Sequence, residues 1–177
     1  MGRIHLHLHG KLRDSSLKAL AESYQARLQN AGISVHVHND ALSKYLSKLE
    51  SLNGQLVLLD ERGETFTSVD FSKKVQSWTL HASDTHIAIG PAEGWSNLGQ
   101  HLPRISLSEM TFPHEIAAVL FLEQLYRAFQ IIKGTSLAYI IGFHDLMLVG
   151  KRWANAPVDG SEPVSYTHLR AHETRTH

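Results

Sequence analysis

Residues 54–60, GQLVLLD, form a near-continuous apolar run between a glycine and an aspartate. A strand that is apolar on both faces is typical of the interior of a parallel sheet, where helices cover both sides. Alternating strand and helix patterns flank this run on either side. We therefore expect an α/β domain of three layers, in which a mainly parallel sheet lies between helices.

Two strands and two helices are predicted before this run. Residues 3–9, RIHLHLH, and residues 33–38, ISVHVH, alternate apolar and polar side chains with the period of a strand. Residues 15–30 and 40–52 repeat apolar side chains at helical spacing. The order up to residue 60 is thus strand, helix, strand, helix, strand.

The pattern continues after residue 60 with a turn at residues 60–66 and a helix that starts near Thr67 or Ser68. Residues 86–90, HIAIG, and residues 104–110, RISLSEM, are expected to form two further strands. The helix that starts near Thr67 or Ser68 is expected to bury four apolar side chains: Val69, Phe71, Val75 and Trp78.

The clearest helix of the chain is predicted at residues 111–133, TFPHEIAAVLFLEQLYRAFQIIK. Pro113 suits the first turn of this helix and Gly134 suits its C-cap. Beyond Gly134 the sequence has an apolar stretch without convincing periodicity.

The composition is that of an ordinary globular protein of one domain: 177 residues, 42% hydrophobic and 19% charged, with a net charge of zero. Without a global positive charge, RNA binding would require a local basic patch. The absence of cysteine excludes disulfides and thiolate metal sites, and it fits a reducing cytoplasm.

Five histidines on the two predicted strands allow a different function. If the strands are neighbours, these side chains could share one sheet face and bind a metal through neutral imidazoles. No carboxylate pattern accompanies them, and alternating polar residues on a strand usually mark a partly exposed face. The five are His5, His7, His9, His36 and His38.

Three loops follow the predicted strands where open parallel sheets bind ligands, beyond the carboxyl ends. They contain LLDERG at residues 58–63, AIGPAEG at 88–94 and SLSEMTFPH at 106–114. Glycines in them allow sharp turns or close approach of a ligand, although ordinary connecting turns would look the same. No glycine-rich nucleotide-binding fingerprint is present.

Taken in order, these loops and the helix segment EQLYRAF at residues 123–129 resemble the RlmH family of ribosomal RNA methyltransferases, which belongs to the SPOUT class. The segment HGKLRDSSLKALAESYQARL at residues 9–28 resembles the start of the same family. The resemblance covers residues 1–139, which we expect to form the methyltransferase domain.

The resemblance implies S-adenosyl-L-methionine-dependent methylation of N3 of a pseudouridine in large-subunit (23S) ribosomal RNA. It further implies a cytoplasmic homodimer acting on the assembled ribosome, with no metal and no membrane, and a sheet whose C-terminal part forms a trefoil knot. The family usually has a second glycine after Gly90, where this chain has Pro91. By the same resemblance, the residues that bind the methyl donor would be Leu59, Gly90, Leu107, Ser108, Glu109, Met110, Thr111 and Phe112.

The C-terminal part departs from this family. Its members end in a Tyr-His-basic tail at the catalytic site, and Tyr139 fits the tyrosine, but Ile-Ile-Gly follows it in place of histidine. A lost reading frame and a genuine extension both explain residues 140–163. Residues 164–174, VSYTHLRAHET, resemble a translated sequencing adapter, so residues 164–177 are interpreted as an adapter-derived tail. A catalytically impaired relative that binds the donor and RNA is therefore an alternative function.

Overall fold

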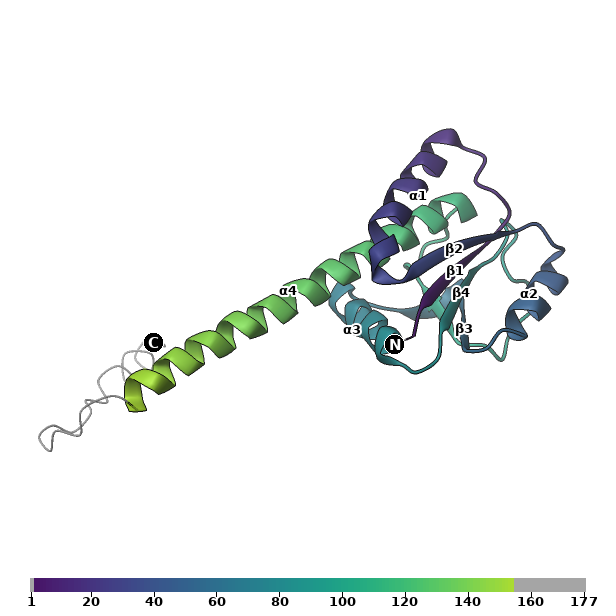
Figure 1. The fold of residues 1–177 in the computed structure, drawn as a ribbon. Helices are drawn as coiled ribbons and strands as arrows, with labels where there is room; N and C mark the ends of the chain where they lie inside the picture. Colours follow the sequence, from purple (N-terminus) through teal and green to yellow (C-terminus); the bar gives the residue numbers. More distant parts are fainter. Residues whose placement is uncertain (1, 155–177) are drawn as a thin grey trace, which may run out of the picture. The chain divides into compact units, whose positions relative to one another are not determined.

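A five-stranded parallel sheet lies at the centre of the fold (Figure 1). The computed structural model describes residues 2–154, except for the side chains of residues 137–143, 145 and 152–154. The strands lie in the order β2-β1-β4-β3-β5, and every neighbouring pair is parallel. They are β1 (Ile4–His9), β2 (Ile33–His38), β3 (Gln55–Thr65), β4 (Thr85–Ile89) and β5 (Arg104–Ser106).

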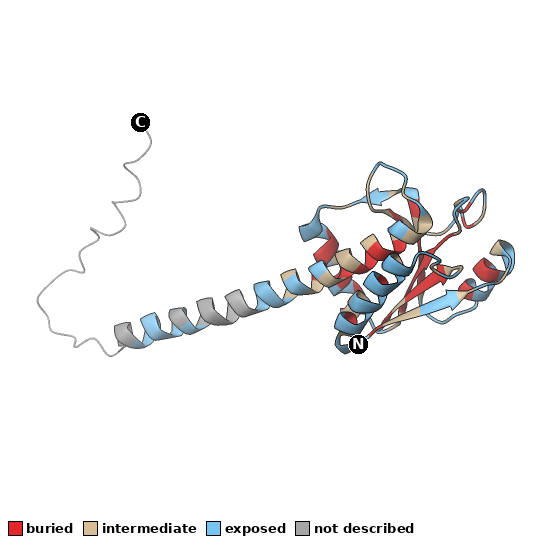
Figure 2. Cartoon of the chain, turned by 90° about the horizontal axis from the view of Figure 1, so that it is seen from above, coloured by how far each residue is buried: buried red, intermediate tan, exposed pale blue. Residues whose placement is uncertain are grey.

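Helices cover both faces of this sheet, which confirms the predicted three-layer α/β architecture. Helices α1 (Ser15–Leu28), α3 (Ser68–Leu80) and the first part of α4 (His114–Ala154) share one apolar core with the sheet. Helix α2 (Leu42–Glu50) packs on the opposite face around Trp95. Figure 2 shows buried positions concentrated in the strands and on the helix sides that face them.

Local side-chain caps fix where two of these helices begin. The Asp14 carboxylate accepts hydrogen bonds from the backbone N–H groups of Ser16 and Leu17, at 2.8 and 2.9 Å. The Thr67 hydroxyl accepts one from the N–H of Asp70 at 3.1 Å. Each bond satisfies an N–H group that has no partner within its own helix.

The prediction that Val69 points inward is wrong. Phe71, Val75 and Trp78 are buried, but Val69 is 54% exposed. Val69 precedes Phe71 by two residues, which places it about 200° around the helix from the buried side. The fourth buried residue of α3 is Ser72 and not Val69.

The turn expected at residues 60–66 is also wrong in part, because β3 continues to Thr65. Its pairing with β5 changes register between Leu59 and Glu64, so the strand bulges at residues 60–63 and then resumes. Gly63 makes this possible, since a Cβ atom there would lie 2.6 Å from the backbone nitrogen of Ile105.

Gly134 does not end the last helix, contrary to the sequence prediction. Helix α4 continues to Ala154, and Gly134 is absent from the glycines with a positive φ angle. No proline interrupts residues 135–154, so the helical hydrogen bonds can continue through Gly134. The chain divides into two compact units, residues 1–136 and 137–177, and the sheet belongs to the first.

Among the described residues, no helix is both long enough and apolar enough to cross a membrane.

Candidate functional site

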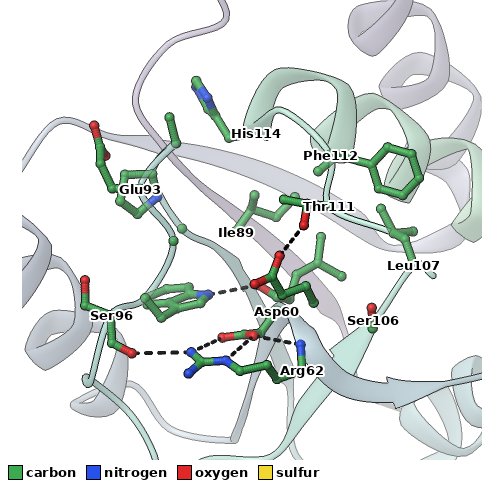
Figure 3. A pocket seen from close by; sticks show the side chains of 18 of the residues that line it. Asp60, Arg62, Ile89, Glu93, Ser96, Ser106, Leu107, Thr111, Phe112 and His114 are labelled. Atoms are coloured by element: carbon green, nitrogen blue, oxygen red, sulfur yellow. Dashed lines mark hydrogen bonds and ion pairs between the residues drawn. The ribbon is translucent and has the colours of Figure 1, made fainter. Parts of the chain in front are cut away.

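A cavity of about 430 Å³ lies where the pairing of β3 with β4 ends (Figure 3). Strand β3 and its bulge, the segment after β4, and the loop between β5 and α4 form its walls. The three loops that the sequence singled out therefore come together at one place in the fold. The cavity is lined by residues 59–62, 89–97, 106–107, 110–112, 114 and 117.

Six of the eight predicted donor-binding residues line this cavity. They are Leu59, Gly90, Leu107, Met110, Thr111 and Phe112. The other two, Ser108 and Glu109, do not line it. The Ser108 hydroxyl instead accepts a hydrogen bond from the N–H of Met110 at 2.9 Å, which shapes the loop. Met110 is 73% exposed, so it lies at the rim.

The loop before α4 is attached to strand β3 across the cavity. The Thr111 hydroxyl donates a hydrogen bond to the Glu61 carboxylate at 2.5 Å (Figure 3). The Ser106 hydroxyl donates to the carbonyl of Ser108 at 2.6 Å. The bond from Thr111 links two walls of the cavity, and the bond from Ser106 shapes the loop that forms one of them.

Asp60 is the most strongly hydrogen-bonded side chain of the cavity. Its carboxylate accepts from the N–H and Nε of Arg62, at 2.9 and 3.1 Å, and from Nη2 of Arg62 at 3.1 Å. It also accepts from Nη1 of Arg104. Burial alone would raise the pKa of Asp60, but the hydrogen bonds from Arg62 and the charges of both arginines outweigh it and lower the pKa.

The same two arginines contact the segment that follows the glycine turn. Nη2 of Arg62 donates to the carbonyl of Ser96 at 3.3 Å, and Nη2 of Arg104 donates to the carbonyl of Leu98 at 2.9 Å. The indole N–H of Trp95 donates to the carbonyl of Leu59 at 2.9 Å. Residues 95–98 are thereby held at three points, two on strand β3 and one on strand β5.

Gly90 packs directly on the ring of Trp95, where a Cβ atom would lie 3.1 Å from Cε2. Pro91 opens a tight turn that the N–H of Gly94 closes by donating to the Pro91 carbonyl at 2.9 Å. Gly94 has a φ angle of 72°, which glycine adopts without strain. Pro91 occupies the first position of this turn, where its carbonyl accepts the closing hydrogen bond, and its ring nitrogen gives the cavity one backbone donor fewer than a glycine would.

Tyr139, the residue predicted to be catalytic, lies in the second unit, and its side chain is outside the described residues. Its backbone is part of helix α4. Its catalytic role stays a prediction.

The predicted histidine face exists, because β1 and β2 are neighbours and pair His7 with His36 and His9 with His38. His86 joins it from β4, with its Nδ1 3.1 Å from Nε2 of His7. His7 is only 4% exposed, so the face is less open than the sequence suggested. Within the part of the chain that the structure describes, no group of three His, Asp or Glu side chains is arranged to hold a metal ion.

Sequence reasoning missed the contacts of Asp60, Arg62, Trp95 and Arg104. An aspartate directly after a buried strand was a visible signal, but its two arginine partners are 2 and 44 residues away. Only the bulge of β3 and the pairing of β5 bring all three together. Neither feature leaves a periodic pattern in the sequence.

A family model described as "Predicted SPOUT methyltransferase" matches residues 2–137. Three similar curated relatives carry the name ribosomal RNA large subunit methyltransferase H. The relative from Coprothermobacter proteolyticus is 33% identical over 135 residues, which is 75% of this chain and 96% of the relative. That from Prochlorococcus marinus is 38% identical (71% and 88%), and that from Synechococcus sp. is 37% identical (71% and 89%).

Proposed function

Because the chain belongs to the SPOUT methyltransferase family, we propose that it transfers a methyl group from S-adenosyl-L-methionine to large-subunit ribosomal RNA. The strongest support for this proposal is that the residues matched by the family model are the ones that form the cavity. The matched residues include every wall of the cavity, and the cavity lies where parallel sheets bind ligands. The finer proposal is N3 of a pseudouridine in 23S RNA of the assembled ribosome, with a cytoplasmic, knotted homodimer as the enzyme.

The cavity suits the proposed donor in size and chemistry. Ligand pockets of about 300–1,000 Å³ are usual, and this one falls within that range at about 430 Å³. Leu59, Ile89, Leu107 and Phe112 offer apolar contacts to an adenine ring, while backbone groups of the loops offer hydrogen bonds. When bound, S-adenosyl-L-methionine supplies a methyl group activated by the neighbouring sulfonium.

The protein must place the acceptor nitrogen in line with that methyl group and accept its proton. Positioning of two reactants accounts for a large part of the acceleration in such transfers. The imide N3 is only weakly acidic, so a base or a hydrogen-bonding group that helps to remove its proton would assist the transfer. We propose that the phenol of Tyr139 is such a hydrogen-bonding group, as the resemblance to the family implies.

Two cations close to the cavity support an RNA partner. The Glu115 carboxylate in the first turn of α4 accepts from the backbone N–H groups of Arg13 and Asp14, at 3.0 and 3.1 Å. This fixes the loop that carries Lys11 and Arg13 beside His114, which lines the cavity. Among the described residues, neither Lys11 nor Arg13 has an ion-pair partner, and both are exposed. Such cations are suited to contact phosphates.

The test is methyl transfer to ribosomes that lack the modification. The full chain is compared with a chain rebuilt to end in Tyr-His-Arg at Tyr139, and Tyr139→Phe is made in the rebuilt chain. We expect transfer by the rebuilt chain and its loss in Tyr139→Phe. If the rebuilt chain binds neither donor nor ribosomes, the proposed function is wrong.

One observation favours a second candidate, a donor-binding and RNA-binding relative without catalysis. Ile140 and Ile141 follow Tyr139 where the family has histidine and a basic residue. Calorimetric binding of S-adenosyl-L-methionine by the full chain, together with no transfer to ribosomes, would identify this candidate. Transfer by the full chain would exclude it.

A further inference from the structure

We propose that Asp60 is a positioning residue for the donor cavity: it holds Arg62 and Arg104 so that they fix residues 95–98 against strands β3 and β5. This inference rests on the proposed function, because it concerns the cavity in which the methyl donor would bind. Asp60 itself would act through the protein backbone and would not touch the donor.

Hydrogen bonds from the two arginines occupy the Asp60 carboxylate. Four donors from Arg62 and Arg104 converge on its two oxygens, and its side chain is only 4% exposed. A carboxylate so fully engaged has little capacity left for a ligand. Its effect on the cavity must therefore pass through the groups that it holds.

The two guanidinium groups connect Asp60 to the backbone of residues 96 and 98. The guanidinium group of Arg62 donates from Nε and Nη2 to Asp60 and also from Nη2 to the carbonyl of Ser96. That of Arg104 donates from Nη1 to Asp60 and from Nη2 to the carbonyl of Leu98. Arginine is suited to such bridging because its donors form a rigid planar fork. Figure 3 shows the side chain of Arg62 between Asp60 and Ser96.

The backbone of Ser96 has a conformation that is unusual for serine. Its φ angle is 50°, and among the described residues it is the one non-glycine residue with a positive φ. A serine persists in this conformation only where its surroundings impose it. The hydrogen bond from Arg62 to the Ser96 carbonyl is such a constraint, and it depends on Asp60.

The consequence lies at Gly90. Trp95 precedes Ser96, its ring supports Gly90, and its indole N–H is bonded to Leu59. Leu59 and Gly90 are two of the predicted donor-binding residues. Loosening residues 95–98 would therefore disturb the donor cavity through Trp95, while the larger apolar core beneath α1, α3 and α4 contains neither Trp95 nor Leu98 and would stay intact.

The test compares three variants of the full chain. Asp60→Asn keeps the shape of the side chain but removes its charge and one acceptor oxygen. Arg62→Gln removes the guanidinium group of Arg62, whose side chain is 57% exposed. Asp70→Asn is the matched control, because Asp70 also accepts from a cation, Lys73, but lies on α3 away from the cavity. Calorimetry measures the Kd for S-adenosyl-L-methionine, and NMR measures hydrogen exchange of the indole N–H of Trp95 with Trp78 as internal reference.

We expect Asp60→Asn to raise the donor Kd about tenfold and Arg62→Gln about threefold, with the double variant no worse than Asp60→Asn alone. Exchange at Trp95 should quicken in both variants and stay unchanged at Trp78 and in Asp70→Asn. A residue with only a general structural role would lower the Tm without these specific changes.

Two results would overturn the inference. One is unchanged Trp95 exchange and donor Kd in Asp60→Asn, or in Arg62→Gln if Asp60→Asn does not fold. The other is a double variant whose donor Kd is raised by the product of the two single effects. Asp60 and Arg62 would then act independently, which would mean that Asp60 contacts the donor itself. Failure of both the unaltered and the rebuilt chain to bind donor would count against the proposed function instead, and Trp95 exchange would still decide whether Asp60 holds the segment.

Discussion

Acidification should destabilise this protein through the buried histidine His7. Its Nδ1 lies 3.0 Å from Nε2 of His38, its Nε2 lies 3.1 Å from Nδ1 of His86, and Nε2 of His86 lies 3.1 Å from the carbonyl of Asn53. Because a carbonyl only accepts, His86 must donate to it. With all three imidazoles neutral, the hydrogen bonds then point in one direction: His38 donates to His7, His7 donates to His86, and His86 donates to the carbonyl of Asn53.

A proton added to His7 would place an N–H group against the N–H of His38 and a charge within a cluster of imidazoles. Burial, and then the neighbouring His36, His38, His86 and His5, lower the pKa of His7 from 6.5 to about 3. Burial also lowers the pKa of His36 and of His38, with further lowering by His5 and His86 at His36 and by Lys48 at His38.

The sign of the pH effect follows from this lowered pKa. The unfolded chain takes up the proton first, so the contribution of His7 is complete above pH 6.5 and is lost as the pH falls toward 3. At about 1.4 kcal/mol per pH unit, the loss from His7 between about pH 8 and about pH 5 is about 2 kcal/mol. Buried carboxylates such as Asp60 lose their contribution at lower pH, below this interval.

Urea unfolding followed by circular dichroism, at several pH values between about 8 and 5, tests this magnitude. His7→Gln keeps a donor and an acceptor but cannot titrate, so its free energy of unfolding should fall by about 2 kcal/mol less than that of the parent over this interval. His81→Gln, an exposed position outside the sheet, is the control and should follow the parent. Equal pH slopes for the parent and His7→Gln would refute the reasoning.

Three glycine substitutions test other parts of the structure. Gly63→Ala should destabilise by about 2 kcal/mol, because its Cβ would meet the backbone of Ile105; urea unfolding measures this, and a neutral effect would contradict the close approach of β3 and β5. Gly90→Ala should weaken donor binding about tenfold in calorimetry, because Trp95 is held by its own hydrogen bond and cannot move away; an unchanged Kd would count against that. Gly134→Ala should stabilise helix α4 by about 0.5–1 kcal/mol in thermal unfolding, whereas a loss of stability would mean that the helix ends there.

Periodicity was enough to predict the elements of the sheet domain, because each of them is set by neighbours in the sequence. The alternation at residues 3–9 and 33–38 and the apolar run at 54–60 reflect which faces are buried. Parallel strands joined by helices then permit few arrangements. The place of the ligand cavity could be predicted as well, because parallel sheets bind ligands beyond the carboxyl ends of their strands.

Individual interactions at the site were not predictable in the same way. The pairing of Asp60 with Arg104 depends on the register between β3 and β5, and that register shifts at the bulge. The burial of His7 depends on which strand lies on each side of β1, which places His86 and His38 against it. Polar side chains on a strand look alike in sequence whether the neighbouring strands expose or enclose them.

The end of helix α4 could not be predicted from Gly134 alone. Glycine is a poor helix residue and a good C-cap, so Gly134 predicts an end only if the following residues favour leaving the helix. The residues after it in this chain include good helix formers and no proline before Pro157, so the helix continues and takes the backbone of Tyr139 with it. In a chain that ended in Tyr-His-Arg, only a few residues would follow Gly134, and little would offset the cost of a helical glycine. The position of Tyr139 therefore depends on residues 140–154 as much as on its own segment, which is why the rebuilt chain is the decisive comparison for its catalytic role.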